Sequence, residues 1–123
     1  MVFKKSIMVF TVLFVLINFL PVKGETDWEW NKIGLNLCNE GRFSEGLYCY
    51  NRAIKLNVTY EDAWLNKGDV LVILGDYLKA LSSYDRVLKI NPLSTTALNK
   101  KSDVFTRLGK YNDAVSCYDK SIE

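Results

Sequence analysis

The sequence predicts an all-α protein built from three copies of a helix-turn-helix unit. Glycines recur every 34 residues at Gly41, Gly75 and Gly109, and several other residue types keep the same spacing. Ahead of each glycine, apolar residues follow the i, i+3, i+4, i+7 spacing of one helix face. Behind each glycine, a small residue is followed four positions later by a tyrosine. Many matching positions in one frame indicate an internal repeat.

The first helices of the three units are predicted over residues 28–40, 62–74 and 96–108. In the first copy, Trp30, Ile33 and Leu37 supply the apolar face. Each of these helices runs up to one of the three repeated glycines, where a helix end favours a residue in the left-handed conformation. A tight turn is therefore expected at each glycine.

The second helices are predicted over residues 43–56, 77–90 and 111–122. Their small residues are Gly46, Ala80 and Ala114, and their aromatic residues are Tyr50, Tyr84 and Tyr118. A small side chain lets the two helices of a unit approach closely, and the aromatic ring fills the space one turn later. Glycine at position 46 is expected to weaken its helix by ~1 kcal/mol relative to alanine.

These positions resemble the tetratricopeptide repeat family, whose pattern is W-x2-L-G-x2-Y, A-x3-F, P. The three copies read Trp30-x2-Ile33-Gly34-x2-Leu37 with Gly46-x3-Tyr50, Trp64-x2-Lys67-Gly68-x2-Leu71 with Ala80-x3-Tyr84 and Pro92, and Leu98-x2-Lys101-Ser102-x2-Phe105 with Ala114-x3-Tyr118. The resemblance implies a right-handed α-solenoid of units 27–60, 61–94 and 95–123, the last truncated. Val58, Lys67 and Lys101 depart from the pattern, and the lysine stems are expected to pack while their ammonium groups reach water.

Residues 1–24 differ in composition from the repeats. They hold Lys4, Lys5 and Lys23, no acidic residue, and an apolar run over residues 7–20 that ends at Pro21. This is the layout of a secretory signal peptide, and a retained membrane anchor is the alternative. In both cases the positive-inside rule predicts that residues 25–123 are exported. The expected localisation is secreted or anchored through the amino-terminal segment.

Composition excludes several chemistries. The chain has no histidine, which removes Ser-His-Asp triads, Cys-His dyads and histidine-dependent zinc sites. Most glycines occupy repeat positions, so no phosphate-binding loop is predicted. Without the leader, thirteen basic and fourteen acidic residues remain, with no concentrated basic surface for nucleic acid. No catalytic residue, cofactor or metal is therefore expected, and the membrane is involved only through residues 1–24.

Export would allow the three cysteines to form disulfides and one asparagine to be glycosylated. Cys49 and Cys117 share a position two repeats apart, about 20 Å at ~10 Å per helix layer, too far for a disulfide. Cys38 and Cys49 occupy positions held by small residues elsewhere, which favours free or buried thiols over a bridge. Asn57-Val58-Thr59 is an acceptor triplet for glycosylation, and the alternative is that Asn57 is only a turn residue.

In the family it resembles, the first helices line a concave groove that holds a peptide. The corresponding residues here are Trp28, Asn31, Leu35, Leu65, Asn66, Asp69, Val72, Asn99, Asp103 and Arg107. One branch of the family grips a terminal carboxylate with two asparagines and three cations. Only Asn66 and Lys100 match that clamp, because Asn31, Leu35 and Thr96 stand at its other three positions. A ligand held by a terminal carboxylate is therefore not expected.

The sequence predicts a non-catalytic scaffold for protein interactions. Apolar Leu35, Leu65, Val72 and Ile73 stand beside Asp62, Asp69 and Asp103 in this groove. They favour an apolar or basic peptide segment as the ligand. Two alternatives stay open: the apolar residues pack on neighbouring repeats while the aspartates are solvated, or the unit self-associates through its uncapped last helix.

Overall fold

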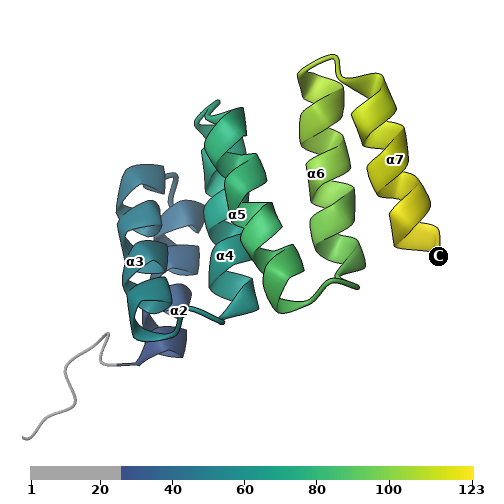
Figure 1. The fold of residues 1–123 in the computed structure, drawn as a ribbon. Helices are drawn as coiled ribbons and strands as arrows, with labels where there is room; N and C mark the ends of the chain where they lie inside the picture. The colour runs from purple at the N-terminus through teal and green to yellow at the C-terminus, as the bar shows by residue number, and fades with distance from the viewer. Residues whose placement is uncertain (1–25) are drawn as a thin grey trace, which may run out of the picture.

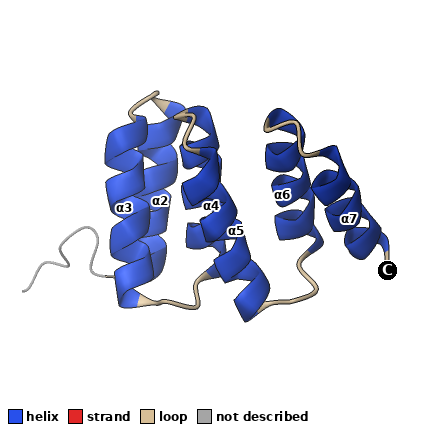
Figure 2. Cartoon of the chain, turned by 45° about the horizontal axis from the view of Figure 1, so that its top comes forward, coloured by secondary structure: helices blue, strands red, loops and turns tan. Residues whose placement is uncertain are grey.

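The structure is a computed structural model that describes residues 26–123, where it contains six α-helices and no strand. The helices are α2 (Asp27–Asn39), α3 (Phe43–Leu56), α4 (Glu61–Ile73), α5 (Tyr77–Ile90), α6 (Thr95–Arg107) and α7 (Tyr111–Ile122). They stand side by side as three antiparallel pairs joined by short turns at alternating ends (Figures 1 and 2). The predicted all-α helical repeat solenoid is confirmed. The predicted leader lies outside the described residues.

The helix ends follow from local chemistry. The second helices begin and end at the predicted residues, and each first helix begins one residue earlier than predicted. Gly41, Gly75 and Gly109 have φ angles of 77°, 80° and 73°, the left-handed conformation that ends a helix. Thr26 forms a capping box with Glu29 at the start of α2. The three predicted glycine turns are therefore present.

A tyrosine and a glycine form the centre of each of the first two units. Tyr50 and Tyr84 are each only 1% exposed. A Cβ atom added to Gly34 or Gly68 would lie 2.6 or 2.4 Å from the corresponding tyrosine ring. The glycine is needed because the ring rests directly on the backbone of the first helix.

The third unit carries Ser102 at this glycine position. Its hydroxyl donates to the carbonyl oxygen of Ala114 at 2.7 Å. Tyr118, the matching tyrosine, is 42% exposed. The third unit is therefore less tightly closed around its tyrosine than the first two.

Gly46 has a role that the repeat pattern did not predict. A Cβ atom at this position would lie 2.3 Å from Cys38 Sγ and 3.1 Å from the carbonyl oxygen of Gly34. In the other units alanine occupies this position, and Val72 or Thr106 stands at the repeat position of Cys38. The expectation that Gly46 only weakens its helix is therefore incomplete, because Cys38 takes the space of the missing methyl group.

The two lysines that depart from the family pattern do pack along their stems. The ammonium group of Lys101 lies 2.5 Å from a carboxylate oxygen of Asp85 on α5. The ammonium group of Lys67 lies 5.3 Å from the centre of the Trp64 ring, and burial lowers the pKa of Lys67. Both charges therefore have a partner inside the array, an acid for Lys101 and an aromatic face for Lys67.

Candidate functional site

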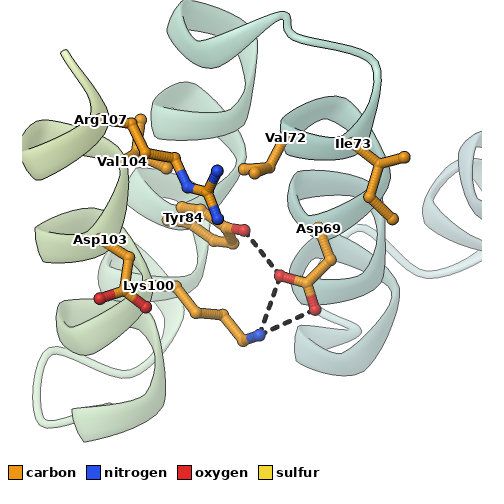
Figure 3. A pocket seen from close by; sticks show the side chains of 8 residues that line it. All are labelled: Asp69, Val72, Ile73, Tyr84, Lys100, Asp103, Val104 and Arg107. Atoms are coloured by element: carbon orange, nitrogen blue, oxygen red, sulfur yellow. Dashed lines mark hydrogen bonds and ion pairs between the residues drawn. The ribbon is translucent and has the colours of Figure 1, made fainter.

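A concavity of about 230 Å³ lies between α4 and α6. Figure 3 shows side chains from α4, α5 and α6 converging on it. Its lining residues are Asp69, Val72, Ile73, Tyr84, Lys100, Asp103, Val104 and Arg107. Seven of these belong to α4 or α6, the helices on which the sequence predicted a groove. The concavity is large enough for one or two side chains of a ligand.

Asp69 is the most heavily bonded residue of the concavity. It accepts a hydrogen bond of 2.6 Å from the Tyr84 hydroxyl group, and Lys100 Nζ lies 2.9 and 2.8 Å from its two oxygens (Figure 3). Burial and the adjacent Asp69 carboxylate raise the pKa of Tyr84 well above its ordinary value. The negative charge of Asp69 is therefore used inside the array, where it connects α4, α5 and α6.

The other charges of the concavity are more accessible. Asp103 is exposed and accepts a hydrogen bond of 2.7 Å from the Tyr118 hydroxyl group. Arg107 is exposed and makes no ion pair with any residue between 26 and 123. A ligand could therefore meet one carboxylate and one guanidinium group on α6 without first breaking an ion pair.

Two of the first helices, α2 and α4, expose apolar side chains. Ile73, at the end of α4, is 59% exposed, and it lies beside the partly buried Val72. On α2, Trp28 and Leu35 are 53% and 41% exposed. These side chains keep apolar area in water that a bound peptide would cover.

Asn31 is placed differently from the other predicted groove residues. It is 6% exposed, its amide oxygen accepts from Asn66 at 2.9 Å, and its amide nitrogen lies 3.4 Å from the Tyr60 hydroxyl group. Both polar groups of its side chain therefore bond within the protein. Asn31 and Asn66 link α2 to α4 instead of presenting free amides to a ligand.

The remaining predicted residues divide between the core and the surface. Leu65 is partly buried and packs against the cluster of Leu71, Ala80, Tyr84 and Val104, whereas Asn99 is exposed on α6. Tyr84 and Val104 line the concavity although the sequence placed neither in the groove. Tyr84 was assigned to the space between paired helices, and nothing in the repeat pattern indicates that its hydroxyl group reaches Asp69.

The described residues contain no cluster of acids, cysteines or histidines that could hold a metal ion. Cys38, Cys49 and Cys117 are free thiols, as the sequence predicted.

Asn57 lies at the end of α3, where its amide nitrogen donates to Asp27 at 2.7 Å and its oxygen accepts from the Thr59 hydroxyl group at 2.9 Å. Both halves of the Asn57 amide therefore stabilise the turn, and its glycosylation stays a prediction.

Comparison with known proteins identifies the repeat. The family model described as tetratricopeptide repeat matches residues 31–95 and 74–123. The chain therefore belongs to the tetratricopeptide repeat family. A stretch of 46 residues is 46% identical to the uncharacterized protein MJ0572 of Methanocaldococcus jannaschii, covering 37% of this chain and 54% of that protein. The chain thus spans about half the length of this relative.

Solved structures show the same fold at low sequence identity. MamA aligns with a TM-score of 0.79 at 22% identity, over 87% of this chain and 63% of that one. The second repeat domain of Spaghetti (RPAP3), bound to the HSP90 peptide SRMEEVD, aligns with a TM-score of 0.74 at 17% identity, over 80% and 92%. YrrB, described as having an unusual peptide-binding site, aligns with a TM-score of 0.74 at 22% identity, over 80% and 50%.

Proposed function

We propose that this chain is a non-catalytic scaffold that binds a peptide segment of another protein along the face formed by α2, α4 and α6. The observation that carries the proposal is that first helices expose apolar side chains: Trp28 and Leu35 on α2, and Ile73 of α4, which lines the concavity between α4 and α6. The peptides bound by structurally similar repeat domains support the same general role.

The proposed ligand is an apolar segment with a basic flank. Its apolar side chains cover Leu35 and Ile73, which removes their surface from water. Asp62 and Asp103 are exposed and make no ion pair within residues 26–123, so they can attract a lysine or arginine of the ligand. Asp69 contributes little to this attraction because Lys100 already neutralises it.

A peptide-display selection against residues 26–123 tests this function. We expect the selected peptides to share an apolar residue with a neighbouring lysine or arginine, and Ile73→Asp to weaken their binding by tenfold or more. Leu78→Asp is the matched control, because Leu78 is 72% exposed on α5 and does not line the concavity. Selected peptides that bind Ile73→Asp as well as the original protein would rule out this ligand site.

We also propose that the repeats act on the far side of a membrane, as the composition of residues 1–24 predicts. None of the helices within residues 26–123 is long and apolar enough to cross a bilayer. Protease protection and amino-terminal sequencing of the native protein test the proposal. Export would be contradicted if amino-terminal sequencing finds residues 1–24 still attached and the repeats resist external protease to the same extent as cytosolic proteins.

A further inference from the structure

Arg107 extends into the concavity between α4 and α6 without an ion pair to any residue between 26 and 123. Figure 3 shows its side chain reaching from α6 toward the space between the two helices. The dashed lines of the figure join Lys100, Asp69 and Tyr84, and none reaches Arg107. An exposed guanidinium group, with its fan of N–H donors, is therefore open to a ligand at this site.

The acid on the same helix does not pair with Arg107. Asp103 stands four residues earlier on α6, which is the spacing and the order at which an acid and a base on one helix attract each other. Its carboxylate instead accepts a hydrogen bond of 2.7 Å from the Tyr118 hydroxyl group. The local partner of Arg107 is thus engaged elsewhere, and the guanidinium group faces the concavity.

The second acid that lines the concavity is also engaged. Lys100 Nζ lies 2.9 and 2.8 Å from the two carboxylate oxygens of Asp69, and one of these oxygens also accepts from Tyr84 at 2.6 Å. The charges of Asp69 and Lys100 therefore cancel. Among the residues that line the concavity, Arg107 is the cation that a ligand can neutralise.

The α4 side of the concavity is apolar. Val72 and Ile73 line it there, and Ile73 is 59% exposed. Ile73 and Arg107 occupy the same repeat position, so α4 presents an aliphatic side chain where α6 presents a guanidinium group. A concavity of about 230 Å³ holds only one or two ligand side chains. The ligand groups that meet Ile73 and Arg107 are therefore close together in the ligand.

We propose that Arg107 selects a peptide segment in which an aspartate or glutamate lies within two residues of an apolar residue. The carboxylate binds the Arg107 guanidinium group, and the apolar side chain packs on Val72 and Ile73. Arginine suits this role because its planar group can form two parallel hydrogen bonds with one carboxylate. The inference rests on the proposed function and adds an acidic residue, bound at α6, to the apolar and basic residues of that ligand.

A side-chain carboxylate fits this site better than a terminal one. A desolvated terminal carboxylate needs several charge-assisted donors around it. Here Asn66 already bonds to Asn31, and Lys100 already pairs with Asp69. One exposed guanidinium group is enough for an acidic side chain that stays partly in water.

Parallel selections from peptide libraries test the role of Arg107. The peptides are displayed inside a loop of a carrier protein, so that none has a free carboxyl end, and each contains one fixed leucine with random neighbours. Selection against the purified protein should enrich aspartate or glutamate within two residues of the leucine. Selection against Arg107→Glu should enrich lysine or arginine there instead. Lys110→Glu is the matched control, because Lys110 is an exposed cation that does not line the concavity, and it should select the same acidic peptides as the original protein.

A binding titration then measures the contact. The most enriched acidic peptide is synthesised with an amidated carboxyl end and titrated by fluorescence anisotropy. Replacing its acid with the neutral amide, or Arg107→Gln in the protein, should each weaken binding about three- to fivefold, as for a partly exposed ion pair. The two changes together should weaken binding no more than either alone, because both remove the same contact. Circular dichroism of Arg107→Gln and Lys110→Glu checks that both variants remain folded.

The possible failures have separate meanings. If no peptide is enriched, or if Ile73→Asp binds the selected peptides as well as the original protein, the proposed function fails and this inference fails with it. If Ile73→Asp abolishes binding but Arg107→Glu selects the same acidic peptides, the groove binds peptides and Arg107 does not select among them. If the synthetic peptide binds more than tenfold tighter with a free carboxyl end than with an amide, the site is one for a terminal carboxylate and the assignment to an acidic side chain is wrong.

Discussion

Gly46, which stands where the other two units have alanine, packs closely against Cys38. Alanine at position 46 would normally stabilise the helix by ~1 kcal/mol relative to glycine. Here its Cβ atom would lie 2.3 Å from Cys38 Sγ, which would have to leave its place near the Tyr50 hydroxyl group. The steric conflict outweighs the gain in helix propensity, because overpacking a tight contact costs about 1–3 kcal/mol.

We therefore predict that Gly46→Ala lowers the free energy of unfolding, by about 1–2 kcal/mol. Cys38→Ala in the same chain should remove the contact with Sγ and make the second substitution less destabilising, with the 3.1 Å approach to the Gly34 carbonyl oxygen remaining. Urea unfolding of the two single variants and the double variant measures the coupling between them. If Gly46→Ala alone raises the stability, Cys38 does not determine the residue at position 46.

Ionisation of the Tyr84 hydroxyl group should lower the stability of the folded protein at alkaline pH. Its pKa is raised in the folded state by burial and by Asp69, whereas in the unfolded chain it is about 10. The contribution of this group is complete below pH ~10 and is lost as the pH rises toward the folded-state pKa. We predict a decrease in the urea midpoint between pH 8 and pH 11, and a smaller decrease in Tyr84→Phe. Identical decreases in both proteins would show that Tyr84 is not responsible.

The first helices of the units differ in how the backbone N–H groups at their amino ends are hydrogen-bonded. Ser94 precedes α6, and its hydroxyl group accepts a hydrogen bond from the backbone of Ala97 at 3.3 Å. Tyr60 precedes α4 and makes no side-chain cap. Since uncapped backbone N–H groups lose hydrogen bonds at a helix start, α6 relies on its cap more than α4 does.

We predict that Ser94→Ala destabilises the protein by about 1 kcal/mol, the usual effect of losing a helix cap. Thr95→Ala is the matched control, because Thr95 is exposed and follows the cap position. Thermal unfolding followed by circular dichroism gives the comparison. Equal effects of the two substitutions would mean that the hydroxyl group of Ser94 does not stabilise α6.

Across the whole molecule, each unit packs on its immediate neighbours, so stability varies along the array. Within residues 26–123, the third unit has one neighbour, and its Val115, Tyr118 and Ile122 are exposed. The middle unit has neighbours on both sides, and its Leu71, Ala80 and Tyr84 form a buried cluster with Val104 of the third unit. Local opening should therefore begin at α7.

Hydrogen exchange tests this order. Amides of α7 should exchange faster than those of α5, the same helix in the middle unit, because fewer buried contacts must break. Uniform protection of both helices would indicate that the array unfolds as one cooperative unit.

The sequence by itself determined the helices, the three glycine turns and the family, because these depend on local propensities repeated every 34 residues. It also indicated which face of the first helices would be concave. The tertiary structure decided how individual polar groups are used. Asn31 bonds to Asn66, and Asp69 is neutralised by Lys100, since stacking brings side chains from successive units within bonding distance. A repeat pattern gives the position of each residue in its own unit, whereas these bonds depend on which residue the next unit places opposite it.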